Sequence, residues 1–256
     1  MTDFCETTQR YYSQWVDYPL EQAGDGLVLV KTDRRRERQS FYHNPFCLYA
    51  VKTPERFVLS YAPDIEEQIL PLASLLSPHQ SAGEAVALLR EKLDAGVRHS
   101  VKFVFAAKSS QPPSKAVPLT LRHWEDYRQY FWAVFPQVAK AEMEGVREHF
   151  QIICREGYCF GRYEGQQLVS VTRCPTMPYL RELVQEIGIA THPDYQGRGY
   201  ALDTCSACLE KILSEGKTPL WSCSAANLPS ANLARKLGFL PYADVFSLFG
   251  STPIQV

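Results

Sequence analysis

The most regular pattern of apolar and polar positions lies between residues 183 and 216. Apolar residues at odd-numbered positions up to Ile189 indicate a strand that buries one face. After a short turn, apolar residues recur at spacings of three and four from 201 to 213, which is typical of one face of a helix, and Gly216 is suited to end it. Pro193 lies between the two patterns and stops the strand from continuing. The chain here predicts a strand, a turn and an amphipathic helix in succession.

The turn has the sequence Gln196-Gly197-Arg198-Gly199-Tyr200-Ala201. Glycines allow the backbone to approach a phosphate closely, and the start of a helix offers N–H groups and the positive end of its dipole. We therefore expect this loop to hold a pyrophosphate. A generic nucleotide-binding loop fits less well, because the chain has no G-x-x-x-x-G-K-S/T and no G-x-G-x-x-G followed by an acidic residue about 20 positions on.

A second segment follows a predicted strand at 219–224 and reads Asn227-Leu-Pro-Ser230-Ala-Asn-Leu-Ala-Arg-Lys-Leu-Gly238-Phe239. The two segments resemble the CoA-binding motifs of the GNAT acetyltransferases, which are a Q/R-x-x-G-x-G/A loop and an N-x-x-A/S-(x)7-G-F helix. The order of the two motifs, with a strand between them, also agrees with that family. The resemblance covers roughly residues 117–250.

This resemblance implies the GNAT fold, an α/β fold with a mixed, mostly antiparallel sheet in which strands four and five splay apart. The other patterns of this half agree with the GNAT order, β-α-α-β-β-β-α-β-α-β. The further elements that we expect are strands at 119–122, 158–163 and 167–173 and helices at 124–135 and 139–155.

In that fold acetyl-CoA, the co-substrate, lies in the slot between the splayed strands. The resemblance implies that the backbone of Ile189, Ala190 and Thr191 pairs with the pantetheine amides. It implies that the pyrophosphate is held by the loop residues Gln196, Gly197, Arg198, Gly199, Tyr200 and Ala201. Asn227 and Ser230 are expected to contact the pantetheine arm from the other side.

Amide formation requires a group that takes a proton from the attacking amine. Glu186 lies on the predicted fourth strand, where many GNAT members carry a catalytic glutamate, and is the candidate base. The structural alternative is a glutamate at the rim of the sheet, paired with Arg173 or Arg181. Many members carry a tyrosine acid where this chain has Ala234. Tyr242 is the remaining candidate acid, and without one the CoA thiolate leaves unaided.

Residues 1–110 carry no motif of this kind. Their apolar patterns predict strands at 27–31, 46–52, 57–61 and 101–107. Asp64 and Ser81, each followed by glutamate three residues on, predict the starts of two capped helices. The Pro- and Ser-rich segment 109–118 is typical of a linker. We therefore expect a smaller α/β domain over residues 1–110 and a GNAT domain over residues 117–256. The smaller domain covers the acceptor side of the slot, mediates dimerisation or is a diverged second copy of the GNAT domain.

The basic run Arg34-Arg35-Arg36-Glu37-Arg38 has two interpretations. It fits a solvated loop, which is the usual place for such a run. It also fits a site for an anionic group, either the CoA 3′-phosphate or an acidic acceptor.

The composition is that of a globular protein, with 45% hydrophobic and 21% charged residues in 256 and a net charge of −1. Such a charge argues against nucleic acid or an anionic membrane as the main partner. The chain has no basic and apolar leader and no uncharged apolar run near 18 residues, so we expect a cytoplasmic protein. We expect the eight cysteines to be reduced and to hold no metal, because Cys205 and Cys208 fall on the apolar helix face without further ligands.

These features lead to the hypothesis of an acetyl-CoA-dependent N-acetyltransferase that acts on a primary amine of a small molecule, a peptide or a protein. A homodimer is compatible with it. The alternative is a CoA-binding module without turnover, which Ala234 favours.

Overall fold

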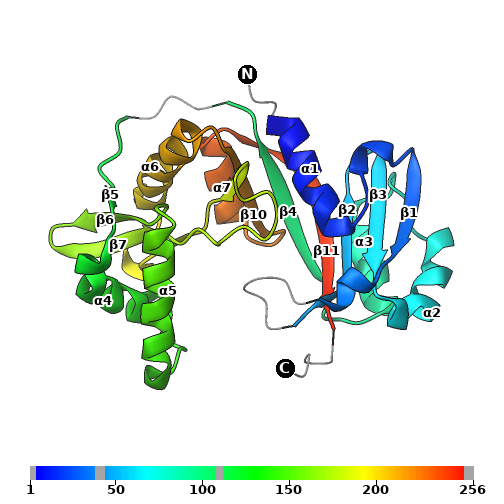
Figure 1. The fold of residues 1–256 in the computed structure, drawn as a ribbon, viewed down its shortest axis with the longest axis horizontal. Helices are drawn as coiled ribbons and strands as arrows, with labels where there is room; N and C mark the ends of the chain where they lie inside the picture. The colour runs from blue at the N-terminus through cyan, green and yellow to red at the C-terminus, as the bar shows by residue number, and fades with distance from the viewer. Residues whose placement is uncertain (1–3, 38–43, 108–111, 251–256) are drawn as a thin grey trace.

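The computed structural model describes residues 4–37, 44–107 and 112–250, which form two sheets and the helices around them (Figure 1). The larger sheet has seven strands, in the order β1 (Gly26–Lys31), β3 (Arg56–Tyr61), β2 (Phe46–Lys52), β11 (Phe239–Phe249), β4 (Arg98–Phe105), β10 (Thr218–Ser224) and β8 (Val184–Glu186). The smaller sheet has four strands, in the order β5 (Val117–Pro118), β6 (Phe160–Glu164), β7 (Gln167–Thr172) and β9 (Ile189–Thr191). The β1–β3 and β8–β10 pairs are parallel and the other pairs are antiparallel, so the mixed, mostly antiparallel α/β architecture is confirmed.

Helices cover both sheets. The predicted start of α3 and the predicted end of α6 are both confirmed. The helices are α1 (Phe4–Val16), α2 (Glu66–Ile69), α3 (Ala82–Lys92), α4 (Trp124–Val134), α5 (Met143–Arg155), α6 (Tyr200–Ser214) and α7 (Leu228–Lys236). The capping box of α3 is confirmed, because Ser81 accepts from the Glu84 N–H while the Glu84 carboxylate accepts from the Ser81 N–H. α6 ends before Gly216, whose φ of 71° is the left-handed conformation expected there.

Three local predictions are wrong. The strand expected at 119–122 is β5, two residues earlier, because Thr120 and His123 form a capping box that turns the chain into α4. Asp64 does not cap a helix, since its carboxylate pairs with Arg36 at 3.2 Å. The single strand expected up to Thr191 is divided into β8 and β9.

Strand β4 connects the two halves of the chain. It comes from the first half and lies between β10 and β11 of the second half, and Figure 1 shows β4 and β11 side by side at the centre of the molecule. A division at residues 110–117 would therefore cut through one continuous sheet. Residues 109–111 of the predicted linker lie outside the described residues, and the two-domain organisation stays a prediction.

Helix α1, which the sequence analysis did not predict, packs beside this sheet. Its buried face consists of residues spaced three or four apart, Thr8, Tyr11, Tyr12, Trp15 and Val16. These side chains share a core with Val184, Leu220 and Val245, so residues near the start of the chain form one wall of its second half. Within the described residues, no helix combines the length and the apolar composition that crossing a bilayer requires.

Candidate functional site

The slot that the GNAT fold implies begins where β8 and β9 separate. β8 pairs in parallel with β10, but β9, only two residues later, pairs with β7 in the other sheet. Gly188 lies at the separation, and a Cβ added there would be 2.4 Å from the carbonyl oxygen of Arg173. The Arg173 N–H also donates to the Gly188 carbonyl at 2.7 Å. Only glycine permits this close approach, which directs β9 away from β10.

The glycine-rich loop follows β9 directly and opens α6. Gly197 and Gly199 have φ of 74° and 87°, a left-handed conformation that costs other residues energy. A Cβ at either position would meet nothing within 4 Å, so the loop faces open space. The loop therefore presents its backbone at the N-terminus of a 15-residue helix, as an anion site requires.

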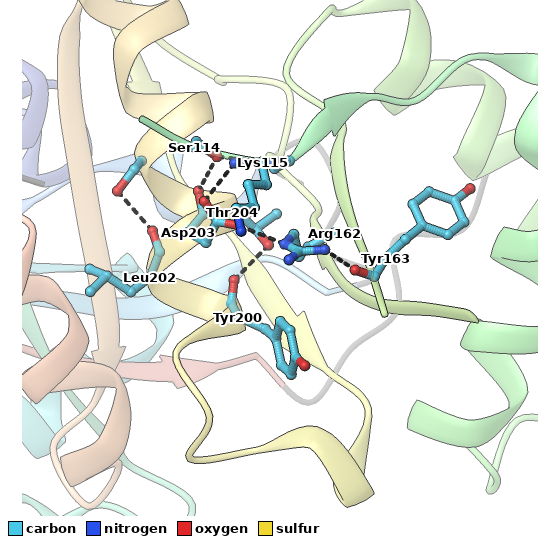
Figure 2. Close-up of polar contacts among 10 residues, drawn as sticks. Ser114, Lys115, Arg162, Tyr163, Tyr200, Leu202, Asp203 and Thr204 are labelled. Atoms are coloured by element: carbon cyan, nitrogen blue, oxygen red, sulfur yellow. Dashed lines mark hydrogen bonds and ion pairs between the residues drawn. The ribbon is translucent and has the colours of Figure 1, made fainter. Parts of the chain in front are cut away.

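The first turn of α6 is fixed from two sides, as Figure 2 shows. The Asp203 carboxylate accepts from the Arg162 Nε at 2.8 Å and from the backbone N–H of Lys115 at 2.9 Å. The Ser114 hydroxyl donates to the Asp203 carbonyl at 2.8 Å. Arg162 lies on β6, and its guanidinium also sits 5.5 Å from the centroid of the Tyr200 ring. The start of α6, and with it the end of the loop, is thus held against the smaller sheet.

A cavity of about 610 Å³ lies beside this loop. It brings together ten of the predicted cofactor residues, Ile189, Ala190, Thr191, Gln196, Gly197, Gly199, Tyr200, Ala201, Asn227 and Ser230. Arg198 does not line it, because its guanidinium lies over the Tyr195 ring at 5.2 Å.

The second motif lines the same cavity and also has a local structural role. Asn227 is the N-cap of α7, since its side-chain oxygen accepts from the Ser230 N–H at 3.1 Å. The Ser230 hydroxyl accepts from the Trp221 indole at 3.2 Å. Both side chains are therefore held in place at the edge of the cavity.

A second cavity of about 540 Å³ contains Glu186, the predicted base. Its Oε1 accepts from the Ser222 hydroxyl at 2.5 Å. Arg173 instead lies 4.6 Å from the centroid of the Phe135 ring, and Arg181 pairs with Glu182. Glu186 therefore forms an ion pair with neither arginine, so the structural alternative for this residue is not observed. Glu186 is half-buried and its carboxylate faces a space large enough for a small molecule.

Two residues beside Glu186 are absent from the sequence-based site. Burial raises the pKa of the Tyr12 phenol well above its usual value, and the Glu186 carboxylate adds to this. Burial lowers the pKa of the Lys102 ammonium, an effect that Glu186 opposes. The Tyr12 hydroxyl has no hydrogen-bond partner within the described residues. Because Tyr12 is on α1 and Lys102 on β4, no local pattern could place them near Glu186.

Tyr242, the predicted acid, lines neither of these cavities. It lies in a third one with Lys52 and His79, and burial raises the pKa of its phenol. Its ring stacks on that of Tyr12 with 6.1 Å between centroids. Tyr12 therefore lies between Tyr242 and the cavity of Glu186. Ala234 is fully buried in the core of α6, α7 and β11, so its side chain faces away from the slot.

The cysteines are free thiols, and those of α6 are core residues, as expected. Cys205 and Cys208 are fully buried. Across residues 4–37, 44–107 and 112–250, no three His, Cys, Asp or Glu side chains are grouped as a metal site would need.

Comparison with known structures supports the fold. An acetyltransferase of the GNAT family from Colwellia psychrerythraea superposes with a TM-score of 0.54 at 13% identity, over 97% of this chain and 96% of that one. A GNAT-family protein from Novosphingobium aromaticivorans gives 0.45 at 20% identity over 61% and 66% of the two chains. A GCN5-related N-acetyltransferase from Sphaerobacter thermophilus gives 0.49 at 12% identity over 69% and 59%. This chain thus covers about two thirds or less of the length of the Novosphingobium and Sphaerobacter proteins.

Comparison at the level of sequence adds the family. No curated protein matches the chain. The family model described as GNAT acetyltransferase matches residues 147–243. This range includes the glycine-rich loop, helix α7 and the strands that contribute residues to the two cavities, β8, β9 and β10. Residues 147–243 thus match the GNAT acetyltransferase family model, and the chain shares the fold of a GNAT-family acetyltransferase structure.

Proposed function

We propose that the protein is an acetyl-CoA-dependent N-acetyltransferase that transfers the acetyl group to a primary amine of a small molecule or a peptide. The observation that carries this proposal is that one divided strand supplies both halves of a transfer site. β9 and the glycine-rich loop line the 610 Å³ cavity, whereas Glu186, at the end of β8 and three residues before β9, lines the 540 Å³ cavity.

In this proposal, acetyl-CoA lies in the 610 Å³ cavity. The N–H groups of the loop and the start of α6 hold the pyrophosphate, because both present partial positive charge to an anion. The slot that opens at Gly188 receives the pantetheine arm, between β9 on one side and Asn227 and Ser230 on the other.

The acceptor amine lies in the 540 Å³ cavity, where Glu186 takes its proton directly or through a water. The neutral nitrogen attacks the thioester carbon, and the C–S bond then breaks to release the CoA thiolate. The nitrogen loses its second proton to the thiolate or to solvent, which leaves the amide and CoA. Tyr12 keeps its proton because the pKa of its phenol is raised, so its hydroxyl can donate a hydrogen bond to the departing sulfur. We assign this role to Tyr12 rather than to Tyr242, which lies outside the cavity.

The second candidate is a CoA-binding module without turnover. The burial of Ala234 favours it, since no tyrosine acid can be presented from that position. The two candidates agree on CoA binding and differ in whether an acetylated amine is formed.

The first test is calorimetric binding of acetyl-CoA, with NAD and ATP as controls, followed by mass spectrometry of amines incubated with the protein. We expect acetyl-CoA to bind, NAD and ATP not to bind, and an amine to gain an acetyl group. Gly199→Glu should abolish binding, because it places a carboxylate where the pyrophosphate lies. Gly157→Glu is a matched control, since Gly157 is also exposed, has φ of 82° and has no atom within 4 Å of an added Cβ.

The outcomes separate the candidates. Undiminished binding in Gly199→Glu would contradict the placement of the pyrophosphate. Binding without any acetylated amine would favour the module without turnover.

A further inference from the structure

Arg35 differs from its neighbours in the basic run. It lies on the 3₁₀ turn Asp33–Arg36, where Arg34 pairs with Asp17 at 2.6 Å and Arg36 pairs with Asp33 at 2.7 Å. Arg35 itself is turned inward and is only 1% exposed. Its Nε, Nη1 and Nη2 donate no hydrogen bond within the described part of the chain.

A buried guanidinium without a partner is costly, because a charge removed from water normally needs an opposite charge or several hydrogen bonds. Burial accordingly lowers the pKa of Arg35. Its guanidinium carbon lies 5.8 Å from the centroid of the Tyr49 ring. Tyr179 and the Asp17 carboxylate, which pairs with Arg34, also favour its charged form. Five N–H donors at such a position are suited to bind an oxyanion.

Arg35 is one of the residues that line a cavity of about 850 Å³, which also contains Arg98. Two carboxylates border this cavity, but both have partners. Asp64 accepts from Arg36, and Asp94 accepts from the Gly96 N–H at 2.6 Å. Arg98 lies over the Phe249 ring at 4.5 Å and forms no ion pair with the described residues. Since Asp64 is neutralised by Arg36, Arg35 and Arg98 face only the carboxylate of Asp94 among the described residues, which leaves an excess of one positive charge.

This cavity adjoins the one that contains Glu186. Gly96 and Arg98 line both, and Tyr49, on which Arg35 rests, lines the Glu186 cavity. The wall near their junction is aromatic, formed by Trp15, Phe46 and Tyr49. The joined space thus has the Glu186 carboxylate in one cavity, Arg35 in the other and Arg98 where the two meet, with apolar rings along the wall between Glu186 and Arg35.

We propose that the acceptor is an amine that carries an oxyanion, a carboxylate or a phosphate, at its far end, and that Arg35 with Arg98 binds this anion while the amine lies at Glu186. The inference rests on the proposed acetyl transfer and adds the substrate class to it. An apolar spacer, aliphatic or aromatic, joins the two ends of the acceptor along the ring-lined wall.

The test compares the kcat/KM of amines with and without the anion. The probes are 4-(aminomethyl)benzoate against benzylamine, and ω-amino carboxylates and ω-aminoalkyl phosphates of graded length against the matching monoamines. A charge-assisted contact with a buried cation should raise kcat/KM about 10- to 100-fold at one preferred length. The carboxylate and phosphate series identify which oxyanion the site takes.

Variants assign the effect to Arg35. In Arg35→Met the kcat/KM for the charged acceptor, divided by that for the uncharged acceptor, should fall to near one. In Arg35→Lys part of the preference for the charged acceptor should be retained. Arg34→Met is the matched control, because Arg34 is on the same turn but lines neither cavity. It should keep the wild-type ratio.

Equal kcat/KM for charged and uncharged amines at every length would overturn the inference while leaving acetyl transfer intact. If no amine is acetylated, acetyl transfer fails, and the anion site is then tested alone by the thermal stabilisation that benzoate and inorganic phosphate give. Stabilisation of the wild type that is reduced in Arg35→Lys and lost in Arg35→Met would still support the site, and no stabilisation would exclude it.

Discussion

Glu186 combines two features that a general base needs. Its carboxylate faces a cavity, and its Oε1 is held by the Ser222 hydroxyl at 2.5 Å, so one oxygen is fixed in position while the other remains able to take a proton. Local sequence was sufficient to select this residue, because the resemblance places it on a strand next to the loop. Local sequence could not select Tyr12, whose position beside Glu186 depends on contacts with distant strands, and it offered Arg35 only as one member of a basic run.

The Glu186→Gln variant tests the base. We expect kcat to fall about 10²- to 10⁴-fold, because the amide keeps the shape and the Ser222 contact but cannot accept the proton. The Kd of acetyl-CoA should be unchanged by calorimetry, since Glu186 lines the other cavity. Glu182→Gln is the control, with its side chain 82% exposed. Unchanged turnover in Glu186→Gln would mean that the base lies elsewhere.

Gly188 is a residue whose importance only the structure reveals. Gly188→Ala places a methyl group 2.4 Å from the Arg173 carbonyl, so β7 or β9 must move. We expect a loss of about 1–3 kcal/mol in the free energy of unfolding. Thermal denaturation followed by circular dichroism measures it, and the Kd of acetyl-CoA should rise because the slot is distorted.

Gly145→Ala is the control for this substitution. Gly145 lies within α5 and an added Cβ would meet nothing within 4 Å. Alanine there should stabilise by up to about 1 kcal/mol through helix propensity. Equal stability of the two variants would contradict the steric account of the splay.

At the scale of elements, the sequence predicted what depends on neighbouring residues. The strands at 27–31 and 46–52 match β1 and β2 to within one residue, because alternation of side chains is a local signal. The strand expected at 119–122 was wrong because a local capping box competes with extension. That β4 lies between β10 and β11 was not predictable, since strand pairing is decided by side chains more than 100 residues away in the chain.

The role of β4 leads to a prediction for the isolated second half. A fragment of residues 112–256 lacks Phe103 and Phe105, which are buried against Trp221 and Phe239. Removing one core phenylalanine side chain costs about 3–5 kcal/mol, and the fragment also exposes the edges of β10 and β11. We expect it to aggregate or to lack a cooperative thermal transition.

A longer fragment provides the comparison. Residues 94–256 restore β4 and should be more soluble by gel filtration, although β2 is still missing. If residues 112–256 fold and bind acetyl-CoA with the affinity of the whole chain, the division at 110–117 marks an independent domain and the argument from β4 is wrong.

At the scale of the whole molecule, the proposed acceptor site combines residues from both halves of the chain. α1 supplies Tyr12, β4 supplies Lys102, and the 3₁₀ turn after β1 supplies Arg35. The GNAT motifs themselves occur only after residue 186, which is why the sequence identified the cofactor side more completely than the acceptor side. The acceptor side is formed by residues that no shared motif connects.

The position of β11 has a consequence for synthesis. β2 and β4 leave the ribosome long before residues 239–249, yet they do not pair with each other, and β11 fills the place between them. Until residues 239–249 have been synthesised, the nascent chain therefore carries two unpaired strand edges. A polypeptide truncated before Phe239 would contain the glycine-rich loop but could not close its sheet, and such a product is suited to capture by chaperones and proteases rather than to partial activity.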